Sequence, residues 1–165
     1  MDITYVSGGE KFNYRVCALI ISNNKILAMH DERSPYFYLP GGRVHLGETA
    51  EHAVIRELEE ELDITPKILR PLWLIQSFFK EDVDQLNYHE LCVYYLMDIS
   101  DTDLPDKGER FTLREGNHIH DFEWLSFDRL QDEYFYPTFL KKTFTICRSS
   151  SRSKPNTNNQ TNSTW

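Results

Sequence analysis

The stretch that most constrains this chain is residues 41–64, GGRVHLGETAEHAVIRELEEELDI. It begins with a Gly-Gly pair and carries four glutamates within the five positions 57–61. Like charges this close in a helix repel one another by roughly a few tenths of a kcal/mol per pair. A helix that carries this cost usually has a cation that offsets it, so the stretch indicates more than an ordinary surface helix.

The helical phase of the stretch separates two arcs. At about 100° per residue, the apolar arc consists of Val54, Ile55, Leu58 and Leu62. The adjoining arc carries Glu57, Glu60 and Glu61, whereas Glu59 points elsewhere and is predicted to be solvated. Oxygen ligands that converge in this way suit Mg²⁺ or Mn²⁺. The alternative is a solvated acidic face, which leaves unexplained why the acidic arc borders the apolar one.

The spacing of the same residues matches a known signature. Gly42 is followed after five residues by Glu48, and after seven more by residues 56–64, RELEEELDI. This pattern resembles the signature of the Nudix hydrolases, G-x5-E-x7-R-E-U-x-E-E-x-G-U, in which U is aliphatic. Asp63 stands where the family has Gly. Because Asp tolerates the left-handed conformation better than most residues, we expect the helix end to be affected more than the chemistry.

The resemblance implies an α/β Nudix fold, in which a mixed β-sheet is sandwiched between α-helices, and the predicted elements agree with an α/β sandwich. β-Rich apolar runs predict strands over residues 14–22, 25–30, 36–39, 72–79, 89–99 and 119–125. The main helix is predicted from an N-cap at Thr49 to a position before Pro66, and short helices are predicted near residues 126–130 and 138–144. Residues 100–118 read as a long loop. We expect one domain over residues 1–147 and a disordered Ser- and Asn-rich tail over residues 148–165.

The resemblance also implies a reaction and roles for the motif residues. Family members use Mg²⁺, with Mn²⁺ as an alternative, to hydrolyse a pyrophosphate bond in a nucleoside diphosphate linked to another moiety. The implied metal ligands are Glu57, Glu60, Glu61 and the carbonyl of Gly41. Glu57 or Glu61 can double as the general base. Arg56 is expected to orient the acidic cluster by pairing with Glu48, although Glu48 can also be an ordinary anion near the helix start.

Residues outside the motif are candidates for substrate contacts. They are Arg33, Tyr36, Tyr38, Phe78, Glu90 and Glu115. Aromatic rings can stack on a base, Arg33 can meet a terminal phosphate, and either glutamate can supply a further acid. Each has a simpler alternative as a core aromatic or a solvated charge. The pair His118 and His120 resembles part of a transition-metal site but lacks a third ligand at a familiar spacing.

Composition limits the partners. The net charge of −8 argues against a general nucleic-acid or membrane surface, but it permits a small nucleotide that arrives with Mg²⁺. We expect a cytoplasmic protein, because no apolar run has transmembrane length, the N-terminus lacks a signal-peptide core and the three cysteines read as reduced. A homodimer and a monomer both stay open.

Two readings of the function also stay open. The substrate of an enzyme would be a nucleotide, a sugar nucleotide, a dinucleoside polyphosphate or, least in keeping with the charge, a capped RNA end. The alternative is a Nudix-fold sensor or interaction module without catalysis. The complete set of motif glutamates favours the enzyme.

Overall fold

The protein was analysed as a computed structural model that describes residues 1–31, 34–81 and 84–144. Its elements are β1 (Thr4–Ser7), β2 (Glu10–Ser22), β3 (Lys25–Asp31), α1 (Ala50–Leu62), β4 (Lys67–Lys80), β5 (Asn87–Asp98), η1 (Leu104–Lys107), β6 (Arg110–Glu115), β7 (His118–Ser126) and η2 (Arg129–Gln131). Residues 139–144 are also helical. The predicted tail over residues 148–165 lies outside the described residues. None of the described helices is long and apolar enough to cross a membrane.

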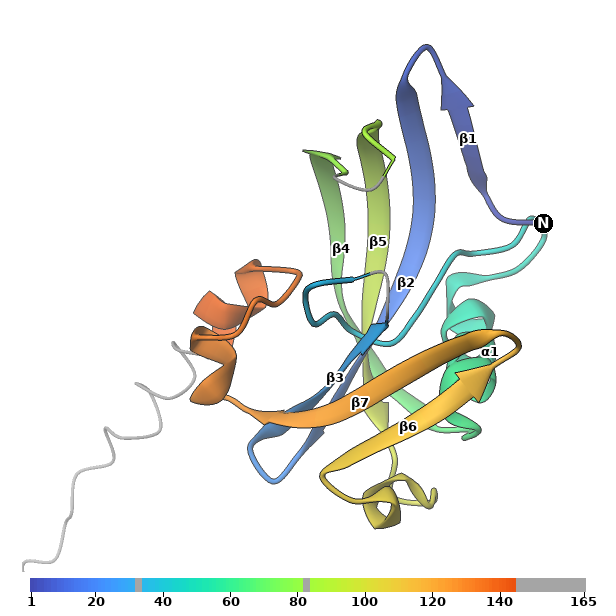
Figure 1. Cartoon of the computed structure of the whole chain (residues 1–165). Helices are drawn as coiled ribbons and strands as arrows, with labels where there is room; N and C mark the ends of the chain where they lie inside the picture. The colour runs from blue at the N-terminus through green and yellow to red at the C-terminus, as the bar shows by residue number, and fades with distance from the viewer. Residues whose placement is uncertain (32–33, 82–83, 145–165) are drawn as a thin grey trace, which may run out of the picture.

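The strands form one mixed sheet in the order β4-β5-β2-β3-β7-β6, with β1 added beside β2. β2 and β5 run parallel, and the other neighbours are antiparallel. Figure 1 shows α1 on one side of this sheet and the C-terminal segment on the other. The predicted α/β sandwich with a mixed sheet is therefore confirmed.

β2 and β3 are paired only beside their turn, at Ile21–Ile26 and Ser22–Lys25, and then diverge. The chain from residue 38 to residue 44 occupies the opening between them. Its backbone carbonyls at Pro40 and Gly42 accept hydrogen bonds of 2.9 Å from Ala18 and Val16 of β2. The Gly-Gly pair is thus held by the same kind of bond that joins the strands, which fixes its position relative to α1.

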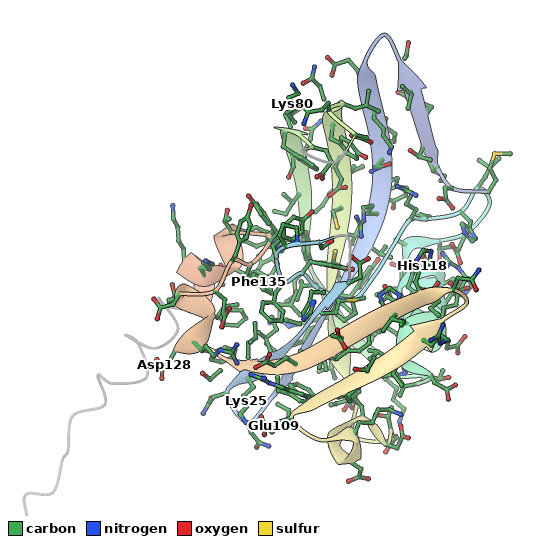
Figure 2. The ribbon with its side chains drawn as sticks, in the orientation of Figure 1. Lys25, Lys80, Glu109, His118, Asp128 and Phe135 are labelled. Atoms are coloured by element: carbon green, nitrogen blue, oxygen red, sulfur yellow. The ribbon has the colours of Figure 1, made fainter. Side chains whose placement is uncertain are left out.

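Side chains alternate between two hydrophobic cores on opposite faces of the sheet, as expected for β-strands. On one face the even-numbered residues of β2 pack against α1, and this core includes Val16, Ala18, Ile20, Val54, Leu58 and Leu62. On the other face β2 and β5 pack against the C-terminal segment, and this core includes Leu19, Cys92, Tyr94, Leu130, Phe135 and Leu140. Figure 2 labels Phe135, which lies in the segment that covers this second face.

The ends of α1 agree with the sequence. The side chain of Thr49 caps the helix by accepting a hydrogen bond of 3.2 Å from the backbone N–H of His52. Asp63 follows the last helical residue with φ 56° and ψ 40°, the left-handed conformation that glycine usually adopts at a helix end. Its N–H donates to the carbonyl of Glu59, so the helix ends normally despite the departure from the motif.

Three local predictions were wrong. Residues 100–118 are not one long loop, because they contain η1 and the strand β6. In β6, Phe111 and Leu113 pack towards the core while the residues beside them point outward, and this alternation is too short to stand out in the sequence. Residues 36–39 form isolated bridges in place of a strand, and the helix near residues 126–130 is a 3₁₀ turn at η2.

We expect Asp63→Gly to raise the free energy of unfolding by about 0.5–1 kcal/mol, because glycine adopts the left-handed conformation without the penalty that a Cβ imposes. Urea denaturation followed by circular dichroism measures the change. Asp63→Ala is the matched control and should lower the stability. A destabilised Asp63→Gly variant would contradict the prediction.

Candidate functional site

The guanidinium of Arg56 is the centre of the site. It donates two hydrogen bonds to Glu48, from Nε to Oε1 at 2.9 Å and from Nη2 to Oε2 at 3.0 Å. Its Nη1 lies 2.9 Å from Oε1 of Glu57 and 3.1 Å from Oε2 of Glu60. A further bond of 2.9 Å joins Nη2 to the backbone carbonyl of Arg43. One side chain therefore ties the helix to the loop before it and places two of the motif carboxylates.

The Gly-Gly pair lies directly against the carboxylates of α1. A Cβ at Gly42 would lie 2.3 Å from the carboxylate of Glu57, whereas a Cβ at Gly41 would lie 2.2 Å from the carbonyl oxygen of Val16. Gly41 also has φ +138°, and its N–H donates a hydrogen bond of 2.9 Å to Oε2 of Glu61. Gly41 has no room for a side chain because it meets backbone, whereas a side chain at Gly42 would displace the Glu57 carboxylate. The two glycines therefore allow close contact between loop backbone and acid groups.

Of the motif carboxylates, Glu61 is buried and Glu57 is largely shielded from solvent. The side chain of Glu57 is 13% exposed, and Glu61 is 6% exposed. Burial raises the pKa of Glu57, although Arg56 opposes the shift. Burial also raises the pKa of Glu61 well above its usual value, and the charge of Glu57 adds to this effect. The site therefore favours the arrival of positive charge, either as a proton or as a cation.

The donor types fit a divalent cation, but the side chains do not surround one as they stand. Among the described residues, no group of three or more His, Cys, Asp or Glu side chains is placed to hold a metal ion. Arg56 supplies the positive charge between Glu57 and Glu60. The carbonyl of Gly41 accepts a long hydrogen bond of 3.4 Å from Nη2 of Arg15. A cation shared by these oxygens would require their side chains to turn.

Arg15 is a site residue that the sequence analysis missed. It lies on β2 beside the Gly-Gly pair, and its Nε is buried without a hydrogen-bond partner among the described residues. Burial alone would lower the pKa of Arg15, but the negative charges around it, led by Glu90, raise that pKa overall. The available signal was a lone arginine inside the apolar run of residues 14–22.

The two glutamate candidates outside the motif, Glu90 and Glu115, interact electrostatically with residues of the site. Glu90 on β5 lies beside Asn13 of β2 in the strand register and acts on Arg15 electrostatically. Glu115, at the end of β6, acts in the same way on Glu61. Glu115 also lies 3.0 Å from Nε2 of His120, so the buried His120 has a carboxylate partner. Within the part of the chain that the structure describes, His120 belongs to no group of three or more possible metal ligands.

The aromatic candidates divide between the two faces of the sheet. Phe78 pairs with His89, whose neighbour Glu90 points to the opposite face because strand residues alternate. Phe79 pairs with Tyr88 and therefore shares the face of Glu90. Phe79 is thus the member of this pair that shares a face with Glu90, and the choice of Phe78 as a substrate contact stays a prediction.

Tyr36 and Tyr38 lie beside the charged groups of the site. Burial raises the pKa of Tyr38, and the charges of Asp31 and Glu61 add to this effect. Burial likewise raises the pKa of Tyr36, which also interacts with Glu81 and Arg15. The remaining candidate, Arg33, lies outside the described residues.

Comparisons with known proteins agree with this geometry. The NUDIX domain family matches residues 11–144. The chain is 36% identical to the ADP-ribose pyrophosphatase of Methanocaldococcus jannaschii over 87 residues, which cover 51% of this chain and 49% of that protein. It is 61% identical over 28 residues to the 8-oxo-dGTP diphosphatase of Escherichia coli K12, covering 17% of this chain and 22% of that protein.

A solved structure titled as UDP-X diphosphatase shares the fold, with a TM-score of 0.58 at 17% identity over 90% of this chain and 66% of that one. The matched segments span about half or less of the length of these two curated relatives. Because the family match extends over most of the chain, the protein belongs to the Nudix family. The resemblance seen in the motif is thereby confirmed.

We expect Glu48→Gln to lower the free energy of unfolding by about 1–3 kcal/mol, because it weakens two charged hydrogen bonds to Arg56. Pairing with Arg56 lowers the pKa of Glu48 from 4.5 to about 2. A lowered folded-state pKa means that the stabilisation is complete above pH 4.5 and is lost as the pH falls towards 2.

Urea denaturation of the wild type and the Glu48→Gln variant across this pH range measures the difference. The two proteins should converge in acid. A difference that stays constant from pH 6 to pH 2.5 would show that the Glu48 charge does not contribute in this way.

Proposed function

We propose that this chain is a Nudix-type pyrophosphohydrolase that uses Mg²⁺, or Mn²⁺, to hydrolyse a nucleoside diphosphate linked to another moiety. The observation that supports this most is the direct contact of the Gly-Gly pair with two motif carboxylates, since Gly41 donates its N–H to Glu61 and Gly42 lies against Glu57. Such an arrangement concentrates negative charge. A cation bound there could in turn bind the phosphate oxygens of a diphosphate. The proposal also follows from membership in the Nudix family.

The residues have distinct roles in this proposal. Glu57, Glu60 and Glu61 would hold the cation, with the carbonyl of Gly41 as a further ligand. A bound divalent cation would neutralise phosphate charge and lower the pKa of a coordinated water. Glu57 or Glu61 accepts the proton from the attacking water.

Arg56 would keep its two bonds to Glu48, whereas Glu57 and Glu60, which it now contacts, would hold the cation. Arg15 lies on β2 and supplies positive charge that attracts the phosphates. Its Nη2 lies 3.4 Å from the carbonyl of Gly41, so the guanidinium lies beside the proposed metal ligands.

The substrate class is inferred from the relatives and from charge. The names of the three compared proteins contain ADP-ribose, 8-oxo-dGTP and UDP, all nucleotides with at least one pyrophosphate bond. We therefore propose a small nucleotide or nucleotide sugar as substrate. The net charge of −8 makes long nucleic acid a poor partner.

A sensor without catalysis is the second candidate. It is favoured by one observation. Arg56 already neutralises part of the acidic cluster, and among the described residues no group of three or more side chains is placed to hold a metal ion. A panel of ADP-ribose, 8-oxo-dGTP, UDP-sugars and diadenosine polyphosphates, incubated with Mg²⁺ or with EDTA, separates the two candidates. Metal-dependent release of nucleotide products supports the enzyme. Binding without hydrolysis of any member would support the sensor.

We expect Glu57→Gln and Glu60→Gln each to lower kcat/KM by about two orders of magnitude or more, since each removes a charged ligand whose contribution is several kcal/mol. The measurement is the initial rate on the best substrate of the panel, at saturating Mg²⁺. Glu59→Gln is the matched control on the same helix, because Glu59 is exposed and its carboxylate accepts a hydrogen bond from Thr65. Unchanged rates in both ligand variants would remove the proposed metal site.

The two glycines should respond differently to alanine. Gly42→Ala places a methyl group against the carboxylate of Glu57, a movable side chain, so we expect a loss of activity of about 100-fold with little change in stability. Gly41→Ala meets the backbone of β2 and an unfavourable φ, so we expect a loss of stability of roughly 2 kcal/mol or more. Thermal denaturation and initial rates on both variants test the contrast. Equal effects on stability would contradict it.

A further inference from the structure

The chain contains the triplet Tyr-Phe-Tyr twice, at residues 36–38 and 134–136. The two triplets are almost 100 residues apart but lie side by side. Phe37 and Phe135 form a parallel bridge, and Phe37 exchanges backbone hydrogen bonds with both neighbours of Phe135, at 2.8 Å and 2.9 Å. The repeated sequence is therefore also a repeated structure, which the sequence analysis did not recognise.

Alternation along the two triplets separates their side chains. Both phenylalanines belong to the core on the C-terminal side of the sheet, where Phe135 is fully buried. The four tyrosines form a cluster of their own. The ring of Tyr36 lies 6.2, 5.6 and 5.0 Å from the rings of Tyr38, Tyr134 and Tyr136.

The geometry of this tyrosine cluster leaves ring surface for a flat ligand. The three contacts of Tyr36 are edge-to-face, at 70–74° between ring planes, and the rings of Tyr134 and Tyr136 are tilted by 59° at 5.7 Å, so no two rings of the cluster are stacked in parallel in these contacts. Tyr134 and Tyr136 are 53% and 43% exposed. A core-filling role accounts for the two phenylalanines but not for exposed tyrosines that gather on the other side of the segment.

The tyrosine cluster is joined to the catalytic region. Gly41 is the third residue after Tyr38, so the chain between them spans at most about 11 Å. Tyr36 interacts electrostatically with Arg15, and Tyr38 interacts with Glu61. A ligand that stacked on the cluster would thus have its phosphates directed towards Arg15 and the glutamates.

We propose that Tyr36, Tyr134 and Tyr136 form the binding surface for the aromatic base of the substrate, an inference that rests on the proposed function. A base stacks on the exposed rings of the second triplet, while Tyr36 holds those rings in place and connects them to the phosphate side. Base–aromatic stacking is tolerant of sequence because every base has a π-face. This surface recognises a nucleobase as a class and sets the affinity for the nucleoside part of the substrate.

The test measures binding of AMP, GMP and ribose 5-phosphate by calorimetry, so that it needs no turnover. We expect Tyr134→Leu and Tyr136→Leu each to weaken AMP and GMP binding about tenfold, with ribose 5-phosphate unchanged. Tyr134→Phe should retain the affinity because it retains the ring. Tyr5→Leu is the control, an exposed tyrosine on β1 that stacks on Phe12, away from the cluster.

Three results would overturn the proposal. They are unchanged AMP and GMP affinity in the Tyr134→Leu, Tyr136→Leu double variant, an equal loss for ribose 5-phosphate, and no binding of either nucleotide to a wild-type protein that hydrolyses nucleotides. Loss of nucleotide binding in the variants of a protein that shows no hydrolysis would retain this surface and reject the enzyme instead. Circular dichroism of each variant confirms that it is folded.

Discussion

The hydrogen bonds of Arg56 are the interaction on which the site depends. A guanidinium offers five N–H donors in a fixed plane, and here they reach Glu48, Glu57, Glu60 and a backbone carbonyl. A lysine could supply the charge but not this set of directions. Because the same group binds the loop and the helix, it turns a run of mutually repelling glutamates into a fixed arrangement.

The sheet leaves space for this arrangement because β2 and β3 are paired along only part of their length. If β2 and β3 stayed paired along their whole length, the Gly-Gly pair would have no place between the strands. Their divergence after Ile21 and Ile26 leaves donors on β2 that the incoming loop satisfies. The loop is therefore as firmly bonded as a strand, although it contains the irregular backbone that lets it touch the carboxylates.

The sequence predicted what depends on local spacing and missed what depends on distant pairing. The helix, its caps and the Arg56–Glu48 contact all lie within a stretch whose offsets can be read directly. The roles of Arg15 and of the second Tyr-Phe-Tyr triplet were not predicted, because they depend on contacts with residues far away in the sequence. Which of Phe78 and Phe79 shares a face with Glu90 also depends on strand register, because a shift of one residue moves a side chain to the other face.

Glu61 shows how this fold sets stability against chemistry. It is one of the buried residues of α1, together with Leu58 and Leu62, and it is the only acid among the buried residues of this helix. Its carboxylate is supported by the N–H of Gly41 but repelled by Glu57. Keeping an acid in such a position destabilises the protein unless a proton or a cation is present. A buried acid in a position that suits a hydrophobic residue is best explained by a role in binding a proton or a cation.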